Sequence, residues 1–118
     1  MSANTADVKA LSALDELRGK LPELQEAFAP QDIILFGSHA RGEAHEWSDI
    51  DLVIVSDTFR DVPRPNRHRP FFKILWNKRS VDVICLTPEE FERMRQWPGV
   101  IGTADKEGIH LEEIAAGA

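Results

Sequence analysis

The chain has 118 residues, of which 42% are hydrophobic and 29% charged, which is typical of a globular domain and excludes a disordered or fibrous chain. Twenty acidic residues against fourteen basic ones give a net charge of −6, which argues against non-specific nucleic-acid binding. The single cysteine excludes an internal disulfide and a multi-cysteine zinc site. We therefore expect a single domain over residues 1–118.

The first third of the chain predicts helix followed by strand. Apolar residues recur at intervals of three and four over residues 7–28, as in an amphipathic helix. Gly19 can end a first helix and Pro22 suits the first turn of a second, so we expect two short helices. The apolar run 32–36, stopped by Gly37, predicts a buried strand that leads into a loop or a short helical turn.

The middle of the chain predicts a second strand and a basic loop. Residues 49–56 alternate, so that one face carries two aspartates and two valines while the other is wholly apolar. Residues 57–70 hold three prolines and four arginines and are expected to form a basic, proline-rich loop. This loop is either a solvated surface or a contact for phosphate, RNA or a partner near the site. A helix is expected over residues 71–78.

The last third adds a third strand over residues 81–86 and a helix. Thr87 to Glu90 match a capping box with proline at the first helical position, which predicts a helix that runs through Trp97. A proline and two glycines then interrupt the chain before a short strand at 108–111. We expect an α/β (α+β) fold with a mixed sheet of three to four strands, helices mainly on one face, and the other face partly open.

Two segments carry residues suited to phosphate and metal chemistry. Gly37 and Ser38 follow a strand directly, so that backbone N–H groups and a hydroxyl can approach phosphate oxygens. Asp49 and Asp51 project to the same face of their strand, where a divalent cation relieves their repulsion, and oxygen ligands favour Mg²⁺ or Mn²⁺. Taken singly, Gly-Ser is also a common turn and Asp a common strand cap.

Asp82 is the candidate for a third carboxylate. It has the opposite parity from Val81 and Val83 in the third strand and so faces away from their apolar contacts. A carboxylate buried in an apolar strand needs a partner. Asp82 therefore either completes a metal site or forms a buried ion pair with Arg79 or Lys78.

Taken together, these residues resemble a known family. Residues 37–42 read Gly-Ser-His-Ala-Arg-Gly, residues 48–52 read Ser-Asp-Ile-Asp-Leu, and residues 81–84 read Val-Asp-Val-Ile. This set, in this order, resembles the minimal nucleotidyltransferase domains of the DNA polymerase β superfamily. The resemblance covers about residues 8–114 and implies the polymerase β palm-like nucleotidyltransferase fold.

The resemblance implies transfer of a nucleoside monophosphate, AMP from ATP in most members, to an acceptor hydroxyl with two Mg²⁺ ions. Asp49 and Asp51 would bind both ions, and Asp82 would hold the second and assist removal of the proton. Gly37 and Ser38 would bind the β and γ phosphates. The same likeness makes Arg41 either a phosphate ligand or an ion-pair partner of Asp49.

The acceptor is expected to lie on a partner. A chain this short has little surface for recognising a second substrate, and similar domains resemble antitoxins that adenylylate a tyrosine of a HEPN-domain ribonuclease. This chain contains no tyrosine, which is consistent with an acceptor on another chain. Two alternatives stay open: an antitoxin or scaffold that neutralises such a ribonuclease by contact alone, and transfer to a small molecule such as an aminoglycoside.

The surroundings of the protein follow from the same residues. No signal-peptide core or membrane span is visible, so we expect a cytoplasmic protein with no membrane partner. An NTP and a HEPN-domain protein encoded nearby are the expected partners, and a nucleic acid is not. Base preference and assembly into a homo-oligomer are left open.

Overall fold

The computed structural model describes residues 5–44, 49–74 and 81–111, with side chains from 14–44, 49–71 and 81–111. No helix within these ranges is both long and apolar enough to cross a bilayer. The elements are, in chain order, α1 (Thr5–Phe28), β1 (Asp32–Phe36), α2 (Ser38–Arg41), β2 (Ile50–Val55), the 3₁₀ turns η2 (Asp57–Phe59) and η3 (Arg64–Asn66), α3 (Arg69–Ile74), β3 (Val81–Leu86), α4 (Pro88–Met94), α5 (Val100–Glu107) and β4 (Ile109–His110).

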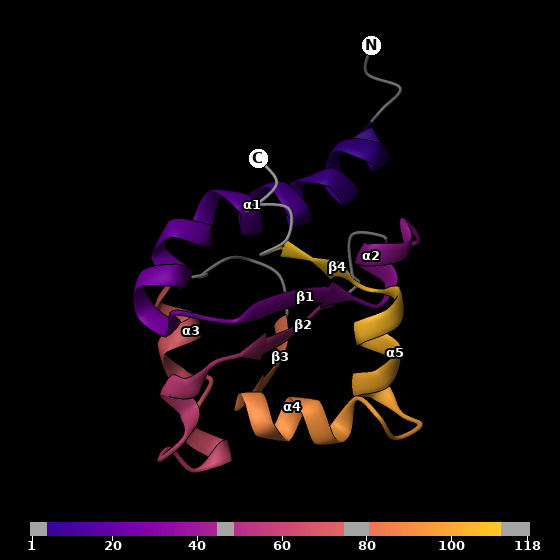
Figure 1. Cartoon of the computed structure of the whole chain (residues 1–118). Coiled ribbons are helices and arrows are strands. Elements are labelled where there is room, and N and C mark those ends of the chain that lie inside the picture. The colour runs from indigo at the N-terminus through magenta and orange to yellow at the C-terminus, as the bar shows by residue number, and fades with distance from the viewer. Residues whose placement is uncertain (1–4, 45–48, 75–80, 112–118) are drawn as a thin grey trace.

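A mixed four-stranded sheet in the order β3-β2-β1-β4 forms the centre of the fold (Figure 1). β1 pairs antiparallel with both β2 and β4, whereas β2 and β3 are parallel. The four strands predicted from the sequence are confirmed, each to within one residue at its ends. Because β2 and β3 are parallel, a long crossover through residues 57–80 has to join them.

α1 is a single helix of 24 residues, so the prediction of two short helices was wrong. Pro22 lies inside it, where the lost backbone hydrogen bond costs about 3 kcal/mol. The large side chains that the helix buries outweigh this cost, because each contributes about 1.5–3 kcal/mol. These side chains are Leu17, Leu21, Leu24 and Phe28.

Apolar side chains cover both faces of the sheet. On one face, the even-numbered residues of β2 pack with α1 and with Phe71 of α3 in the larger core cluster. On the other face, the valines of β2 pack with Ile101 and Ala104 of α5 in a smaller cluster. The sequence left this second face partly open, but α4 and α5 cover it on the side opposite α1 (Figure 1).

The helices of the second half differ from prediction at their ends. α3 starts at Arg69, before the predicted 71–78, and residues 75–80 lie outside the described part of the chain. The capping box of α4 is confirmed: the Glu90 N–H donates to Thr87 Oγ1 at 3.2 Å, and the Thr87 N–H donates to Glu90 Oε1 at 2.9 Å. α4 ends at Met94, short of the predicted end at Trp97.

α5 was not predicted, because its glycines look like chain breakers. Gly102 is buried inside the helix, and a Cβ there would lie 3.0 Å from the carbonyl oxygens of Arg95 and Trp97. The missing side chain therefore lets α5 pack closely against the turn that follows α4. Gly102 therefore allows close packing of α5 and does not interrupt the helix.

Candidate active site

The turn between β1 and α2 is held by one glycine. Gly37 has φ 77° and ψ −154°, a backbone conformation that costs other residues energy. A Cβ on Gly37 would also clash with Oδ2 of Asp51. The Gly37 carbonyl accepts the N–H groups of Ala40 and Arg41, each at 3.1 Å, which starts α2 at Ser38. Gly37 thus lies directly against the Asp51 carboxylate.

The predicted carboxylates meet at this same end of the sheet. Asp51 pairs with Phe36 of β1 on one side and with Asp82 of β3 on the other. Because register partners on neighbouring strands project to the same face, Asp51 and Asp82 lie side by side. Asp49 is exposed just before β2 begins. The turn and the three aspartates, far apart in sequence, thus lie at the same end of the sheet.

The electrostatics of Asp51 reflect this crowding. Partial burial raises the pKa of Asp51, and the negative charges of Asp82 and Asp49 raise it further. The charges of His39 and Arg41 act in the opposite direction but do not cancel the increase. Ionised Asp51 is therefore held beside two like charges, a costly arrangement that a cation would relieve.

The donor set fits Mg²⁺ or Mn²⁺. It consists of carboxylate oxygens alone, from neighbouring strands that share a face, and such oxygens are the ligands these ions prefer. Within residues 5–44, 49–74 and 81–111, no three histidine, cysteine or acidic side chains already stand close enough to enclose an ion. The three carboxylates would therefore have to turn toward one another to bind it.

The sequence also allowed Asp82 to be a buried member of an ion pair. The expected burial of Asp82 is wrong. The Asp82 side chain is exposed, near the start of the edge strand β3. An exposed carboxylate carries no burial penalty that a partner must offset. Arg79 and Lys78, the partners considered from the sequence, lie outside the described residues.

Arg41 makes a different ion pair from the one considered. Its Nε donates to Glu43 Oε1 at 2.8 Å, and both side chains are exposed. The hydrogen bond and charge of Glu43 raise the pKa of Arg41, with smaller contributions from Glu107 and Asp51. Among the described residues, Arg41 thus pairs with Glu43 rather than with Asp49. Its guanidinium stays at the solvent-exposed side of the turn.

Two contributions to this region were missed by sequence reasoning. His39, treated as a variable position, is buried in α2, and its charge lowers the pKa of Asp51. The only sign in the sequence that His39 contributes to this region was its position directly after Ser38. A cavity of about 480 Å³ also adjoins Gly37, and its far side is formed by Val100, Thr103 and Glu107. That side was missed because α5 itself was not predicted.

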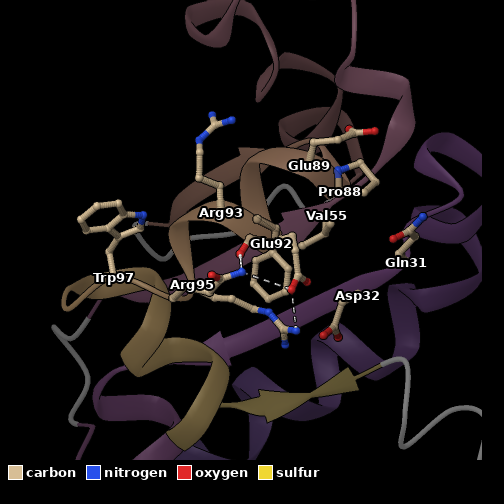
Figure 2. Close-up of a pocket in the computed structure, with 11 residues that line it drawn as sticks. Gln31, Asp32, Val55, Pro88, Glu89, Glu92, Arg93, Arg95 and Trp97 are labelled. Atoms are coloured by element: carbon tan, nitrogen blue, oxygen red, sulfur yellow. Dashed lines mark hydrogen bonds and ion pairs between the residues drawn. The ribbon is translucent and has the colours of Figure 1, made fainter.

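Another cavity, of about 880 Å³, lies at the other end of β1 and β2. Figure 2 shows residues from the start of β1, the end of β2 and α4 around it, with Trp97 on one side and Gln31 on the other. The Arg95 guanidinium there already binds Glu92 at 3.0 Å and Asp105 at 3.4 Å. None of the predicted site residues lines this cavity, so its size does not make it the active site.

The basic loop uses its arginines within the fold. Arg60 binds Glu89 at 2.9 Å, and Arg64 and Arg67 bind Glu90 at 3.3 Å and 2.7 Å. Arg67 is buried and also donates to the carbonyl oxygens of Val62 and Cys85. These three arginines therefore attach residues 57–70 to α4 and the end of β3.

Comparisons with known proteins agree with this geometry. A family model described as "Nucleotidyltransferase domain" matches residues 14–113. A protein adenylyltransferase of Thermococcus cleftensis is 38% identical over 58 residues, which are 46% of this chain and 56% of that protein. A protein of Methanocaldococcus jannaschii named "Putative protein adenylyltransferase" is 46% identical over 48 residues, 40% of this chain and 56% of that one.

The chain spans about half the length of these relatives. A solved structure from Sulfolobus solfataricus, described as "a putative nucleotidyltransferase", superposes with a TM-score of 0.61 at 22% identity. The superposition covers 86% of this chain and 80% of the other, and it shows a common fold. With a family model matched over 100 of its residues and a nucleotidyltransferase fold around the Gly-Ser turn, the chain belongs to the nucleotidyltransferase domain family.

Proposed function

We propose that this protein transfers AMP from ATP to a hydroxyl group of a partner protein, with divalent metal ions. The observation that carries the proposal is the register of Asp51 opposite Asp82, with Gly37 packed against the Asp51 carboxylate. This arrangement supports a phosphate site and a cation site that share one wall. Metal-assisted phosphoryl chemistry needs both sites in contact.

The β1–α2 turn is the proposed phosphate site. Gly37 lacks a side chain, so phosphate oxygens can approach the backbone N–H groups at the start of α2. Ser38 adds a hydroxyl donor, and Arg41 adds positive charge beside the turn. The β and γ phosphates would be held here as the leaving pyrophosphate.

The carboxylates are the proposed metal ligands, with Asp49 and Asp51 shared by two ions and Asp82 on the second. Mg²⁺ bound there would offset phosphate charge and lower the pKa of the acceptor hydroxyl. In the reaction the acceptor oxygen forms a bond to the α-phosphorus, and the bond from that phosphorus to the α–β bridging oxygen breaks. The hydroxyl proton passes to a carboxylate oxygen of Asp82, which is exposed and can release it to water.

The proposed acceptor is a hydroxyl on another protein. The relatives named as protein adenylyltransferases support a protein acceptor, and the lack of tyrosine in this sequence is consistent with a tyrosyl acceptor on another protein. A HEPN-domain ribonuclease, neutralised by AMP transfer in a toxin–antitoxin pair, is the specific partner we propose. Among the described residues, Asp82 is exposed on the edge strand β3, which supports access by a large substrate.

The test uses ATP labelled at the α-phosphate, with γ-labelled ATP beside it, Mg²⁺, host lysate and the product of any adjacent gene. Wild type should attach only the α-label to a protein band. Asp51→Asn should lower this transfer about 100- to 1,000-fold or more, because it removes a shared metal ligand. Asp15→Asn, on the exposed side of α1, is the matched control and should transfer normally.

Metal binding gives a second readout that does not need the acceptor. Mg²⁺ or Mn²⁺ should raise the melting temperature of wild type and of Asp15→Asn, but not that of Asp51→Asn. If Asp51→Asn still neutralises a bound HEPN-domain partner while no label is transferred by wild type, contact alone explains the antitoxin effect. Transfer of label to an aminoglycoside instead of a protein would contradict the proposed acceptor.

A further inference from the structure

His110 in β4 lies between two oxygen acceptors that belong to other elements. Its Nδ1 is 2.6 Å from Oδ2 of Asp32 at the start of β1, and its Nε2 is 2.7 Å from the backbone carbonyl oxygen of Asp105 in α5. His110 pairs with Ile34 in the sheet, so its side chain is on the same face of the sheet as that of Asp32. Figure 1 shows β4 directly after α5 and beside β1. One imidazole ring therefore connects β4, β1 and α5.

Both contacts are hydrogen bonds only if the ring carries two N–H groups. A carbonyl oxygen and an ionised carboxylate can only accept, and a neutral imidazole has a single N–H to donate. The imidazolium form has two N–H groups, one for each acceptor. A proton on Asp32 would serve the same contacts, but an aspartic acid gives up its proton far more readily than an imidazolium does. The geometry therefore matches a protonated His110 beside an ionised Asp32.

We propose that His110 stays protonated at neutral pH and acts as a pH-sensitive latch that holds β4 and α5 against β1. When the proton leaves, one ring nitrogen loses its hydrogen and faces an acceptor oxygen at 2.6 or 2.7 Å. That acceptor is then left without its donor in a largely buried position, which weakens the contact. The latch concerns the attachment of α5 and β4 and does not depend on the proposed transfer of AMP.

The surroundings of Asp32 favour a protonated partner. Only 17% of the His110 side chain and 19% of the Asp32 side chain are exposed, so water compensates the charge of Asp32 incompletely. The second carboxylate oxygen of Asp32, Oδ1, is buried and accepts no hydrogen bond from the described residues. Ionised Asp32 therefore relies on His110. A neutral ring would leave a largely buried negative charge without its cation.

The other charged groups near the ring are consistent with the same protonation state. The Asp105 carboxylate lies 3.8 Å from Nε2 of His110 and adds a second negative charge. The cation bonded to Asp105 is Arg95, at 3.4 Å, and Arg95 also binds Glu92 at 3.0 Å, so its positive charge is already compensated. The charged side chains that line the cavity of about 880 Å³ together with Asp32 are Glu89, Glu92, Arg93 and Arg95 (Figure 2). The two carboxylates that face the ring directly, Asp32 and Asp105, favour a proton on it.

The corner between α5 and β4 is packed too closely for these contacts to lengthen one at a time. The Gly108 N–H donates to the Ala104 carbonyl oxygen at 2.8 Å, and a Cβ on Gly108 would lie 2.5 Å from that oxygen and from Cγ2 of Ile34. The backbone two residues before His110 thus lies directly against β1. We therefore expect loss of the proton to open the corner as a unit. Because α5 also borders the cavity beside the β1–α2 turn, the latch determines how firmly that wall is held.

The first test is an NMR titration of the His110 ring. The folded protein should hold this proton at least about 10-fold more tightly than a free histidine, so the midpoint should lie at least about one pH unit above about 6.5. Asp32→Asn should reverse most of this increase, because an amide can donate to a neutral Nδ1 as well as accept. Asp15→Asn, at an exposed position of α1, is the matched control and should leave the midpoint unchanged. A wild-type midpoint at or below about 6.5 would overturn the inference.

Hydrogen exchange of backbone amides tests whether the proton acts as a latch. A group that binds its proton more tightly in the folded state stabilises the fold fully below about pH 6.5 and loses this contribution as the pH rises through its native midpoint. Between about pH 6 and pH 9, the amides of residues 101–110 should therefore lose about 10-fold in protection, corrected for the intrinsic exchange rate, while those of β2 and β3 lose less. In His110→Gln, which has no titrating ring, this pH dependence should disappear.

Two variants and two outcomes keep the test decisive. Asp32→Asn, which preserves the ring and the size of the partner side chain, should also lose the pH dependence, whereas Asp15→Asn should keep it. An equal loss of protection in α5, β2 and β3 of wild type would assign His110 to global stability and contradict a local latch. Protection of α5 and β4 that does not change with pH would contradict it too. Neither readout requires ATP, so the latch and the proposed AMP transfer can fail independently.

Discussion

The two ends of β3 carry acidic groups in opposite electrostatic conditions. At its start, Asp82 lies beside Asp51, and the pKa of Asp51 is raised by burial and by neighbouring negative charges. Beyond its end, burial of Glu90 favours a higher pKa, but hydrogen bonds from Arg67 and the Thr87 N–H outweigh it and hold the pKa at about 2. The charge of Glu90 is compensated by cations and donors within the fold, whereas the charge of Asp51 is not.

The difference separates a structural charge from one suited to function. Glu90 and Arg67 satisfy each other and fix the basic loop to α4, at a buried point where an unpaired charge would be costly. The aspartates instead stay crowded at one end of the sheet, where the charges of Asp82 and Asp49 disfavour ionised Asp51. Uncompensated charges of this kind are concentrated at functional sites.

The largest effect on stability is expected from removing the positive charge that pairs with Glu90. Arg67→Met should destabilise the protein by about 3–5 kcal/mol, because it removes the buried cation that pairs with Glu90 and the donor to two carbonyl oxygens. Urea unfolding measures this loss. Arg64→Met, at an exposed position with a longer contact to Glu90, is the control and should cost below about 1 kcal/mol. Equal losses in both variants would contradict the structural role of Arg67.

Gly37→Ala addresses the other end of β3. The added methyl group meets Asp51 Oδ2 and occupies a backbone conformation with positive φ, so it should push the carboxylate from its position. We expect AMP transfer to fall about 100-fold and stability to fall by about 1–3 kcal/mol. Gly19→Ala, inside α1 with no atom near its Cβ, should leave AMP transfer unchanged and raise stability by about 0.5–1 kcal/mol. A fully active Gly37→Ala protein would argue against this turn as the phosphate site.

The pH dependence of stability measures how strongly the fold stabilises ionised Glu90. The native pKa of Glu90, about 2, lies below its ordinary value of 4.5, so its stabilising contribution is complete above 4.5. It is lost as the pH falls through about 2, when the paired carboxylate gains a proton. Glu90→Gln should flatten the fall in stability between these values. Glu89→Gln, an exposed residue of the same helix, should keep most of it, as thermal unfolding across the acid range can measure.

The smallest expected effect is a gain in stability, whereas Arg67→Met and Gly37→Ala cause losses. The raised pKa of Asp51 means that the folded state holds its proton more tightly than the unfolded chain, so ionisation at neutral pH costs stability. Asp51→Asn should therefore stabilise the metal-free protein by about 0.2–1 kcal/mol at pH 7, the usual size of a like-charge cross-strand contact. The gain should vanish at acid pH. A loss of stability at pH 7 would show that the carboxylate is compensated after all.

Much of this arrangement follows from local pattern in the sequence. The alternation around Asp49 and Asp51 gives the face on which they lie, and the parity of Asp82 gives its side of β3. The capping box at Thr87 identifies the start of α4, because its hydrogen bonds are local. Prediction from the sequence therefore succeeded where residues close together in the chain determine the local structure.

The missed features depend on contacts between distant segments. α5 survives Gly102 only because the turn after α4 packs against it, and α1 survives Pro22 only because its apolar side is buried. The exposure of Asp82 depends on which elements cover its face of β3, and no local pattern contains that information. The pairing of Arg67 with Glu90 likewise requires the loop to fold back onto α4.

The parallel pairing of β2 with β3 also has a consequence for how the site is made during folding. Gly37, Asp49 and Asp51 come from a β1–β2 hairpin-like unit whose contacts are antiparallel and close in sequence. Asp82 joins them only after the crossover has closed, and such non-local contacts form slowly because chain entropy must be lost first. A nascent chain that ends before residue 81 therefore carries the Gly37 turn and two of the three carboxylates of the proposed site. The proposed site would be completed late in synthesis, when β3 docks.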